Sequence, residues 1–122
     1  MRMNPEESAR MKGICEDCRH SLMTNPTSKH LLKRLGYALW ILGEYEEVEE
    51  VCTRILLQDP NDVDWIYSRA MAHLGLGQID QAATDLIEAR SKTDDHRILA
   101  VIAEALQSIE GVRLQQDEGL AA

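Results

Sequence analysis

Side chains that could bind a metal or exchange disulfides gather in one short segment, CEDCRH, which runs from Cys15 to His20. Two cysteines separated by two residues, with a histidine nearby, begin many zinc sites and many thiol redox sites. Within one helix, Cys15 and Cys18 would lie about one turn apart and could reach a common ion. No closing pair of ligands is evident elsewhere in the sequence, so we expect no bound metal. A metal or redox site on this pair is kept as an alternative.

Motifs of other catalytic classes are absent. The sequence has no glycine-rich phosphate loop, no serine elbow and no acid pair whose spacing differs from ordinary surface charge. The four histidines are scattered through different segments. The run EYEEVEE, from Glu44 to Glu50, is most simply the solvated face of a helix. We therefore expect a protein that is not an enzyme, with no catalytic residue and no cofactor.

Length and charge exclude further classes of function. A chain of 122 residues has room for one domain. Its 13 basic residues against 21 acidic ones give a formal net charge of -8, which repels phosphate backbones and anionic lipids. We expect neither nucleic acid nor membrane as a partner. No apolar run approaches the roughly 18 to 20 residues of a membrane span, and the first residues lack the apolar core of a secretion signal. Three cysteines, an odd number, also favour a reducing, cytoplasmic location.

The composition predicts an all-α fold. Phenylalanine is absent, and long segments are rich in Ala, Leu, Glu, Gln and Arg, which lose little side-chain entropy in a helix. Helix-breaking segments interrupt these stretches at five places. They are TNPTS (24–28), LGEY (42–45), QDPND (58–62), LGQID (76–80) and SKTDD (91–95). Five breaks predict six helical segments.

The spacing of the breaks indicates an internal repeat. Gly43 and Gly77 are 34 residues apart, and apolar or small residues match at the same offset along both segments. Each match falls where two helices of a hairpin must approach each other. The matched pairs are Leu32 with Ile66, Gly36 with Ala70, Tyr45 with Ile79, Val48 with Ala82, Cys52 with Leu86 and Ile55 with Ala89.

A period of 34 with this pattern resembles the tetratricopeptide repeat, a helix-turn-helix unit that stacks into a right-handed superhelix. The resemblance covers two units, residues 29–62 and residues 63–96. The first carries the family marks Leu35, Gly36, Gly43, Tyr45 and Pro60, and the second carries Ala70, Gly77, Ala82, Leu86 and Ala89. Departures fall at Leu39, Val48, Ile55, His73 and Asp94. They suggest a slightly wider helix spacing in the first unit and no different fold.

The flanking segments are predicted to cover the ends of the repeats. Residues 14–26 match residues 48–60 one period later, which predicts a half-repeat helix within residues 5–26. Downstream, one apolar stripe at helical spacing predicts a capping helix over 97–117, formed by Ile98, Val101, Ile102, Ala105, Leu106 and Ile109. The predicted fold is a single domain, 1–122, built as a helical-hairpin solenoid of tetratricopeptide type.

Helix starts and the repeat register give predictions for single residues. Asn4, followed by a proline and two acids, is predicted to cap the first helix, and Asp62 and Asp95 are predicted to cap later ones. Cys18 matches Cys52 one period later, so we expect it in the core as a small apolar group. Cys15 matches Glu49 and Ala83, so we expect it to face outward.

In the resembled family, the first helix of each repeat lines a concave groove that receives a peptide or a helix of a partner. Two tyrosines, a tryptophan, a methionine and two aliphatic residues among the corresponding positions could anchor an apolar segment. In the alternative interpretation, Trp40 and Leu74 pack inside the solenoid against the terminal helix. The implied groove residues are His30, Lys33, Arg34, Tyr37, Trp40, Ile41, Asp64, Tyr67, Ser68, Met71 and Leu74.

Some members of the family hold the terminal carboxylates of a partner in a clamp of lysine, asparagine and arginine. Here Arg34 occupies an asparagine position, Asp64 a lysine position and Ser68 an arginine position. Because Asp64 would repel a carboxylate, we expect no such clamp. His30, Lys33 and Arg34 form a basic corner, which either selects an acidic residue of a partner or is a solvated helix start.

Three functional hypotheses follow. The first is a non-enzymatic binding module, an adaptor or chaperone for a protein partner. The repeats are similar to the last repeats of immunophilin-related co-chaperones, and size and charge are similar to those of bacterial type III secretion chaperones. The second is a self-assembling structural protein, a homo- or hetero-oligomer, in which the truncated first repeat leaves an apolar face. The third is the metal or redox site on Cys15 and Cys18.

Overall fold

The computed structural model describes the backbone of residues 3–121 and the side chains of residues 3–117. Six α-helices and no strand lie within this part of the chain, which confirms the predicted all-α class and the number of helical segments. The helices are α1 (Pro5–Leu22), α2 (Lys29–Leu42), α3 (Tyr45–Gln58), α4 (Val63–Gly75), α5 (Ile79–Ser91) and α6 (His96–Ala121). None of them is long and apolar enough to cross a membrane.

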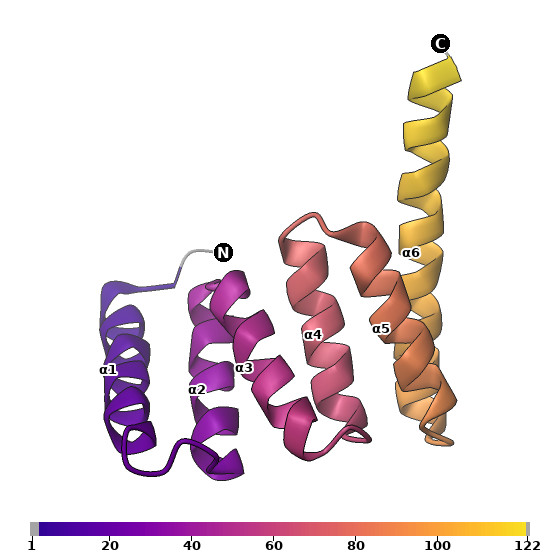
Figure 1. Cartoon of the computed structure of the whole chain (residues 1–122). Helices are drawn as coiled ribbons and strands as arrows, with labels where there is room; N and C mark the ends of the chain where they lie inside the picture. Colours follow the sequence, from indigo (N-terminus) through magenta and orange to yellow (C-terminus); the bar gives the residue numbers. More distant parts are fainter. Residues whose placement is uncertain (1–2, 122) are drawn as a thin grey trace.

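The helices follow one another in a row, and each packs against the next one in the sequence (Figure 1). Connections between them are short, so that neighbouring helices form hairpins. Helices α1 and α6 lie at the two ends of the row (Figure 1). Helix α1 ends at Leu22, earlier than the predicted limit at 26. Helix α6 is longer than the predicted 97–117 and extends beyond α5 and α4 (Figure 1).

Two turns of the chain have the same geometry 34 residues apart. Gly43 and Gly77 both have φ of 74°, a left-handed conformation that glycine adopts without steric cost. The residue after each glycine donates its backbone N–H to the carbonyl five positions before it. These bonds run from Glu44 to Leu39 and from Gln78 to His73, at 3.0 and 2.8 Å. The period found in the sequence is therefore a period of the backbone at these turns.

Two of the three predicted helix caps are confirmed. The Asn4 side chain accepts a hydrogen bond from the backbone N–H of Glu7 at 2.8 Å. Asp95 accepts from two backbone N–H groups in the first turn of α6, at 2.9 and 3.4 Å. The prediction for Asp62 is wrong, because its side chain makes no capping hydrogen bond. Its carboxylate instead accepts a hydrogen bond from Lys33 Nζ at 3.0 Å and links α2 to the start of α4.

The core consists of two clusters of buried side chains. The first lies among α1, α2 and α3 and includes Leu32, Leu39 and Ile55. The second lies among α4, α5 and α6, with Ile66 and Ile102 as fully buried members. Five of the six residue pairs matched at the 34-residue offset are buried in both copies. The exception, Tyr45 with Ile79, is partly buried.

Trp65 of α4 is packed against both clusters and lies directly over Gly36 of α2. A Cβ atom added to Gly36 would stand 2.8 Å from Cζ3 of the Trp65 ring and 3.2 Å from a methyl group of Val51. Because Gly36 has no side chain, the Trp65 indole can lie on α2. This contact joins α2 to α4, although the two helices are not consecutive in the chain.

The cysteines of α1 correct one prediction from the repeat register. Cys18 is buried, as predicted, but Cys15 is also buried, with an exposed fraction of 2%. With Met11 and Leu22, the two cysteines form one stripe at helical spacing, and this stripe faces the first core cluster. The outward orientation expected from the matches of Cys15 was wrong because this register position faces the core in α1, and one of the two matches, Ala83 of α5, is also buried.

The outer face of α1 also differs from expectation. Its exposed residues are charged or polar, apart from Pro5 and Ala9. The truncated repeat was expected to leave an apolar face at this end. That expectation is wrong for the described residues, because the apolar side chains of α1 point inward to the stripe around Cys15.

Candidate functional site

Three adjoining hollows lie along the side of the row formed by α2, α4 and α6, and Tyr67 of α4 lines all three. We call the hollow between α2 and α4 the aromatic pocket, the one between α4 and α6 the α4–α6 pocket, and the one at the starts of α4 and α6 the Asp64 pocket. Their volumes are about 250, 350 and 370 Å³, respectively. Together they form the groove, which is the candidate functional site.

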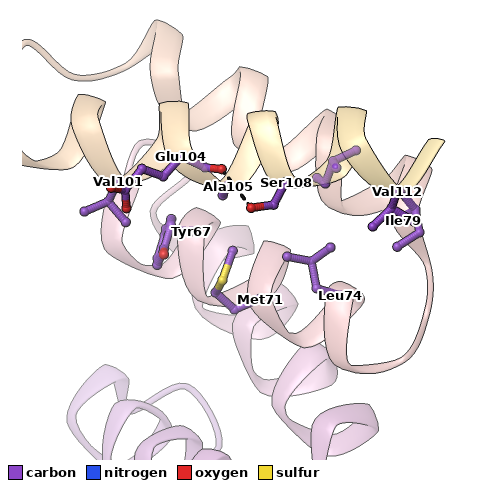
Figure 2. Close-up of a pocket in the computed structure, with 10 residues that line it drawn as sticks. Tyr67, Met71, Leu74, Ile79, Val101, Glu104, Ala105, Ser108 and Val112 are labelled. Atoms are coloured by element: carbon purple, nitrogen blue, oxygen red, sulfur yellow. Dashed lines mark hydrogen bonds between the residues drawn. The ribbon is translucent and has the colours of Figure 1, made fainter. Parts of the chain in front are cut away.

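The α4–α6 pocket is lined mostly by apolar side chains that face each other from two helices (Figure 2). Tyr67, Met71 and Leu74 are spaced by four and three residues on α4, so they share one face of the helix. Val101 and Ala105 of α6 lie opposite them (Figure 2). The terminal helix therefore acts as one wall of the groove, in addition to covering the core.

Four aromatic side chains line the aromatic pocket. Tyr37 and Trp40 come from α2, and Trp65 and Tyr67 come from α4. They are four of the five aromatic residues in the sequence, which has two tryptophans, three tyrosines and no phenylalanine. The fifth, Tyr45, packs its ring edge-to-face against Trp40, with 5.4 Å between the ring centroids.

The rings on the α2 side are open to solvent. Tyr37 is 65% exposed and Trp40 is 41% exposed, values that are high for large aromatic residues. No charged residue lines the aromatic pocket. Sequence reasoning missed Trp65, which is only two residues before the expected Tyr67. The small residue at Gly36, on which the indole lies, was the available signal.

Acidic side chains stand at the α6 side of Tyr67. Asp64 lines the Asp64 pocket together with Arg97, and Glu104 lines the α4–α6 pocket. Neither Asp64 nor Glu104 has an ion-pair partner in the part of the chain that the structure describes. Burial raises the pKa of the Tyr67 phenol, and the negative charge of Glu104 raises it further.

The remaining expected groove residues lie outside these pockets. His30 and Arg34 are exposed on α2, and Lys33 pairs with Asp62 at 3.0 Å. Ile41 is partly buried against the first core cluster. The basic corner expected from these residues is thus partly neutralised, because one of its cations already pairs with a carboxylate.

In the alternative interpretation, Trp40 and Leu74 pack against the terminal helix, and the two residues differ in this respect. Leu74 does lie across from α6 and is partly buried against the second cluster, while it also lines the α4–α6 pocket. Trp40 packs against Tyr45 and lines the aromatic pocket, far along the row from the terminal helix. Only Leu74 therefore lies against that helix.

A buried polar network holds α4 in place behind the groove. The Arg69 guanidinium donates two hydrogen bonds to the Asp85 carboxylate of α5, at 2.8 and 3.0 Å. His73 lies 3.4 Å from the same carboxylate and bonds Gln78 at 2.7 Å. Asp85 is only 4% exposed, and its hydrogen bonds raise the pKa of Arg69. This network was missed, although an aspartate between Ala82 and Leu86 on an apolar stripe was a visible signal.

The cysteines do not form part of the groove. All three thiols are buried and free, and burial raises their pKa values, for Cys52 to about 12. A thiol is a poor nucleophile and a poor metal ligand until it loses its proton. Among the described residues, no three side chains of the metal-binding types come close enough to hold an ion. Geometry and protonation therefore give no support to the metal or redox alternative.

Comparison with known proteins adds no relative to these observations. No protein-family model matches the sequence, and no curated protein matches it either.

Proposed function

We propose that the chain is a solenoid of tetratricopeptide type whose groove binds a peptide or a helix of a protein partner, so that the protein is an adaptor or chaperone. The observation that carries this proposal is the groove of three adjoining pockets over α2, α4 and α6, all lined by Tyr67 and two of them mostly apolar. The repeat type is supported by the turns at Gly43 and Gly77, which share backbone conformation and hydrogen bonds at a 34-residue offset.

The side chains of the groove suit the binding of an extended or helical segment. Tyrosine and tryptophan bring large contact areas and lose little conformational entropy on binding, which is why they dominate many interfaces. Met71 adds an adaptable apolar surface between the aromatic pocket and the α4–α6 pocket. We assign partner contact to seven of the expected residues, namely Tyr37, Trp40, Asp64, Tyr67, Ser68, Met71 and Leu74.

An acidic chain end is a poor candidate for the ligand. Asp64 and Glu104 place negative charge on the α6 side of Tyr67, where a carboxylate of the partner would be repelled. Whether the protein acts as an adaptor or as a chaperone of an aggregation-prone protein, including a secretion substrate, depends on the partner. An aggregation assay of the captured partner, with and without this protein, separates the two roles.

The proposed function is tested with a double variant, Trp40→Ala with Tyr67→Ala, in affinity purification followed by mass spectrometry. Leu57→Ala is the matched control, because Leu57 is 79% exposed on α3 and lines no part of the groove. We expect the partner captured by the wild type and by the control to be lost with the double variant. Circular dichroism must show that all three proteins are folded. Equal capture by the double variant would refute the groove as the binding site.

Self-assembly is a second candidate, and exposed apolar residues of α6 favour that end of the row. Leu114 and Val112 are exposed there. Sedimentation equilibrium over a wide concentration range tests this candidate, since a monomeric mass at every concentration would remove it. Leu114→Glu should restore the monomer if the wild type associates through α6.

A further inference from the structure

The aromatic side chains that line the aromatic pocket favour one chemical class of ligand, organic cations. Faces of tyrosine and tryptophan rings carry partial negative charge and attract organic cations. Four such rings line a hollow of about 250 Å³ that contains no charged side chain of its own. A cation in this hollow would meet no repelling lysine or arginine.

Charge around the aromatic pocket also favours a cation. The chain has a formal net charge of -8, which raises the local concentration of cationic ligands. Asp64 and Glu104, which lie on the α6 side of Tyr67, have no ion-pair partner among the described residues. Arg97 lines the same pocket as Asp64, so that two carboxylates and one guanidinium leave a net negative charge on this side of the groove.

Hydrogen bonding points to the kind of cation. A guanidinium has five N–H donors and needs acceptors, whereas a quaternary ammonium needs none. Three of the residues that line the pocket, Tyr37, Tyr67 and Ser68, carry a hydroxyl group that can accept a hydrogen bond. The Ser68 hydroxyl donates to the carbonyl of Asp64 at 2.9 Å, so its lone pairs remain free to accept. A guanidinium is also more weakly hydrated than an ammonium and stacks on aromatic rings.

We propose that the partner segment carries an arginine whose guanidinium enters the aromatic pocket, between the rings of α2 and those of α4. This inference rests on the proposed function, because it names the side chain that the groove recognises. The three stem methylenes of the arginine lie on Met71 and the tyrosine rings, and the acidic residues beyond Tyr67 complement its charge.

The molecule contains its own reporters for this test. Both tryptophans of the sequence, Trp40 and Trp65, line the aromatic pocket, so each indole N–H signal in a ¹H–¹⁵N spectrum reports on it. The probe is N-acetyl-arginine amide. N-acetyl-citrulline amide has the same shape without charge, N-acetyl-lysine amide has the same charge as a compact ammonium, and N-acetyl-leucine amide is apolar.

We expect the arginine probe to shift both indole signals, with a Kd about two- to five-fold lower than that of the citrulline probe, the difference typical of a cation–π contact at a partly exposed site. The lysine and leucine probes should bind more weakly than arginine. Equal binding of lysine would show general attraction to an acidic protein, and equal binding of leucine would show an unselective apolar pocket. Either result, or the absence of any indole shift with arginine, overturns the inference.

Variants connect the result to the pocket. Tyr37→Leu keeps the apolar surface of this exposed position but removes the ring and the hydroxyl, so the advantage of arginine over citrulline should disappear. Leu57→Ala should retain it, and persistence of the advantage in Tyr37→Leu would contradict the assignment. The pull-down with the Trp40 and Tyr67 double variant is independent of these titrations. Loss of partner capture without any preference for arginine would therefore refute this inference and leave the proposed function standing.

Discussion

At the scale of single residues, the absence of a side chain at Gly36 affects both the packing of the helices and the lining of the candidate site. Gly36 leaves room for the Trp65 indole, which then packs on both core clusters and lines the aromatic pocket. Gly13 of α1 differs, because a Cβ atom added there would meet nothing within 4 Å. Gly36 and Gly13 therefore allow a comparison of a crowded and an open glycine position within helices.

We predict that Gly36→Ala destabilises the protein by about 1–3 kcal/mol, because the added methyl group overlaps the rigid indole and the ring has to move. Gly13→Ala should instead stabilise it by up to about 1 kcal/mol, since alanine is the better helix former and the space is open. Urea unfolding followed by circular dichroism measures both. Equal effects of the two substitutions would show that the Trp65 contact does not limit position 36.

At the scale of elements, the position of α4 decides the shape of the groove, because α4 contributes residues to all three pockets. The pair of Arg69 with Asp85 fixes α4 against α5, and Arg69 Nη1 also lies 3.5 Å from the Thr53 hydroxyl of α3. The network thus connects three consecutive helices behind the site. Its side chains are well inside the protein, where an unpaired charge is costly.

Removing one member of this pair should cost far more than removing a surface ion pair. We predict that Arg69→Ala lowers the free energy of unfolding by about 3 kcal/mol or more, because Asp85 would be left buried without its cation. Arg113→Ala, which breaks the exposed pair with Asp80, should cost less than about 1 kcal/mol. Chemical denaturation of both variants is the measurement. A small loss for Arg69→Ala would show that this pair contributes little to stability.

At the scale of the whole molecule, the row of helices has two core clusters that few side chains connect. Trp65 packs against both, while Ala72 of α4 belongs to the first cluster and Leu56 of α3 belongs to the second. In such a quasi-one-dimensional arrangement, cooperativity depends on the interface between neighbouring units. The interface between α3 and α4 therefore determines whether the chain unfolds as one unit.

We predict that the wild type unfolds in a single transition and that Trp65→Ala lowers its stability by about 3 kcal/mol and separates the two halves. The remaining tryptophan, Trp40 of α2, then reports on the first half of the chain, because it packs against Tyr45, which contacts the first cluster. The tryptophan fluorescence transition and the far-ultraviolet circular dichroism transition should coincide in the wild type and in Leu57→Ala, where both tryptophans are present. They should diverge in Trp65→Ala, and coincidence there would show that other contacts couple the halves.

Local features of the sequence were enough to predict the helices. Helix propensity, the caps at Asn4 and Asp95, and positive φ at Gly43 and Gly77 depend on residues close in the chain. All of the expected groove positions, in contrast, followed from the resembled family. Seven of them line the pockets, whereas His30, Lys33, Arg34 and Ile41 do not.

The sequence by itself thus determined the number of helices, their limits to within a few residues, and the 34-residue period, because these follow from short-range propensity, capping and turn geometry. Only the tertiary structure decided that Cys15 is buried, that Trp65 enters the aromatic pocket and that Arg69 pairs with Asp85. It also made α6 a wall of the groove. Each of these depends on which neighbouring helix covers a given face, and that is set by packing between segments distant in the chain.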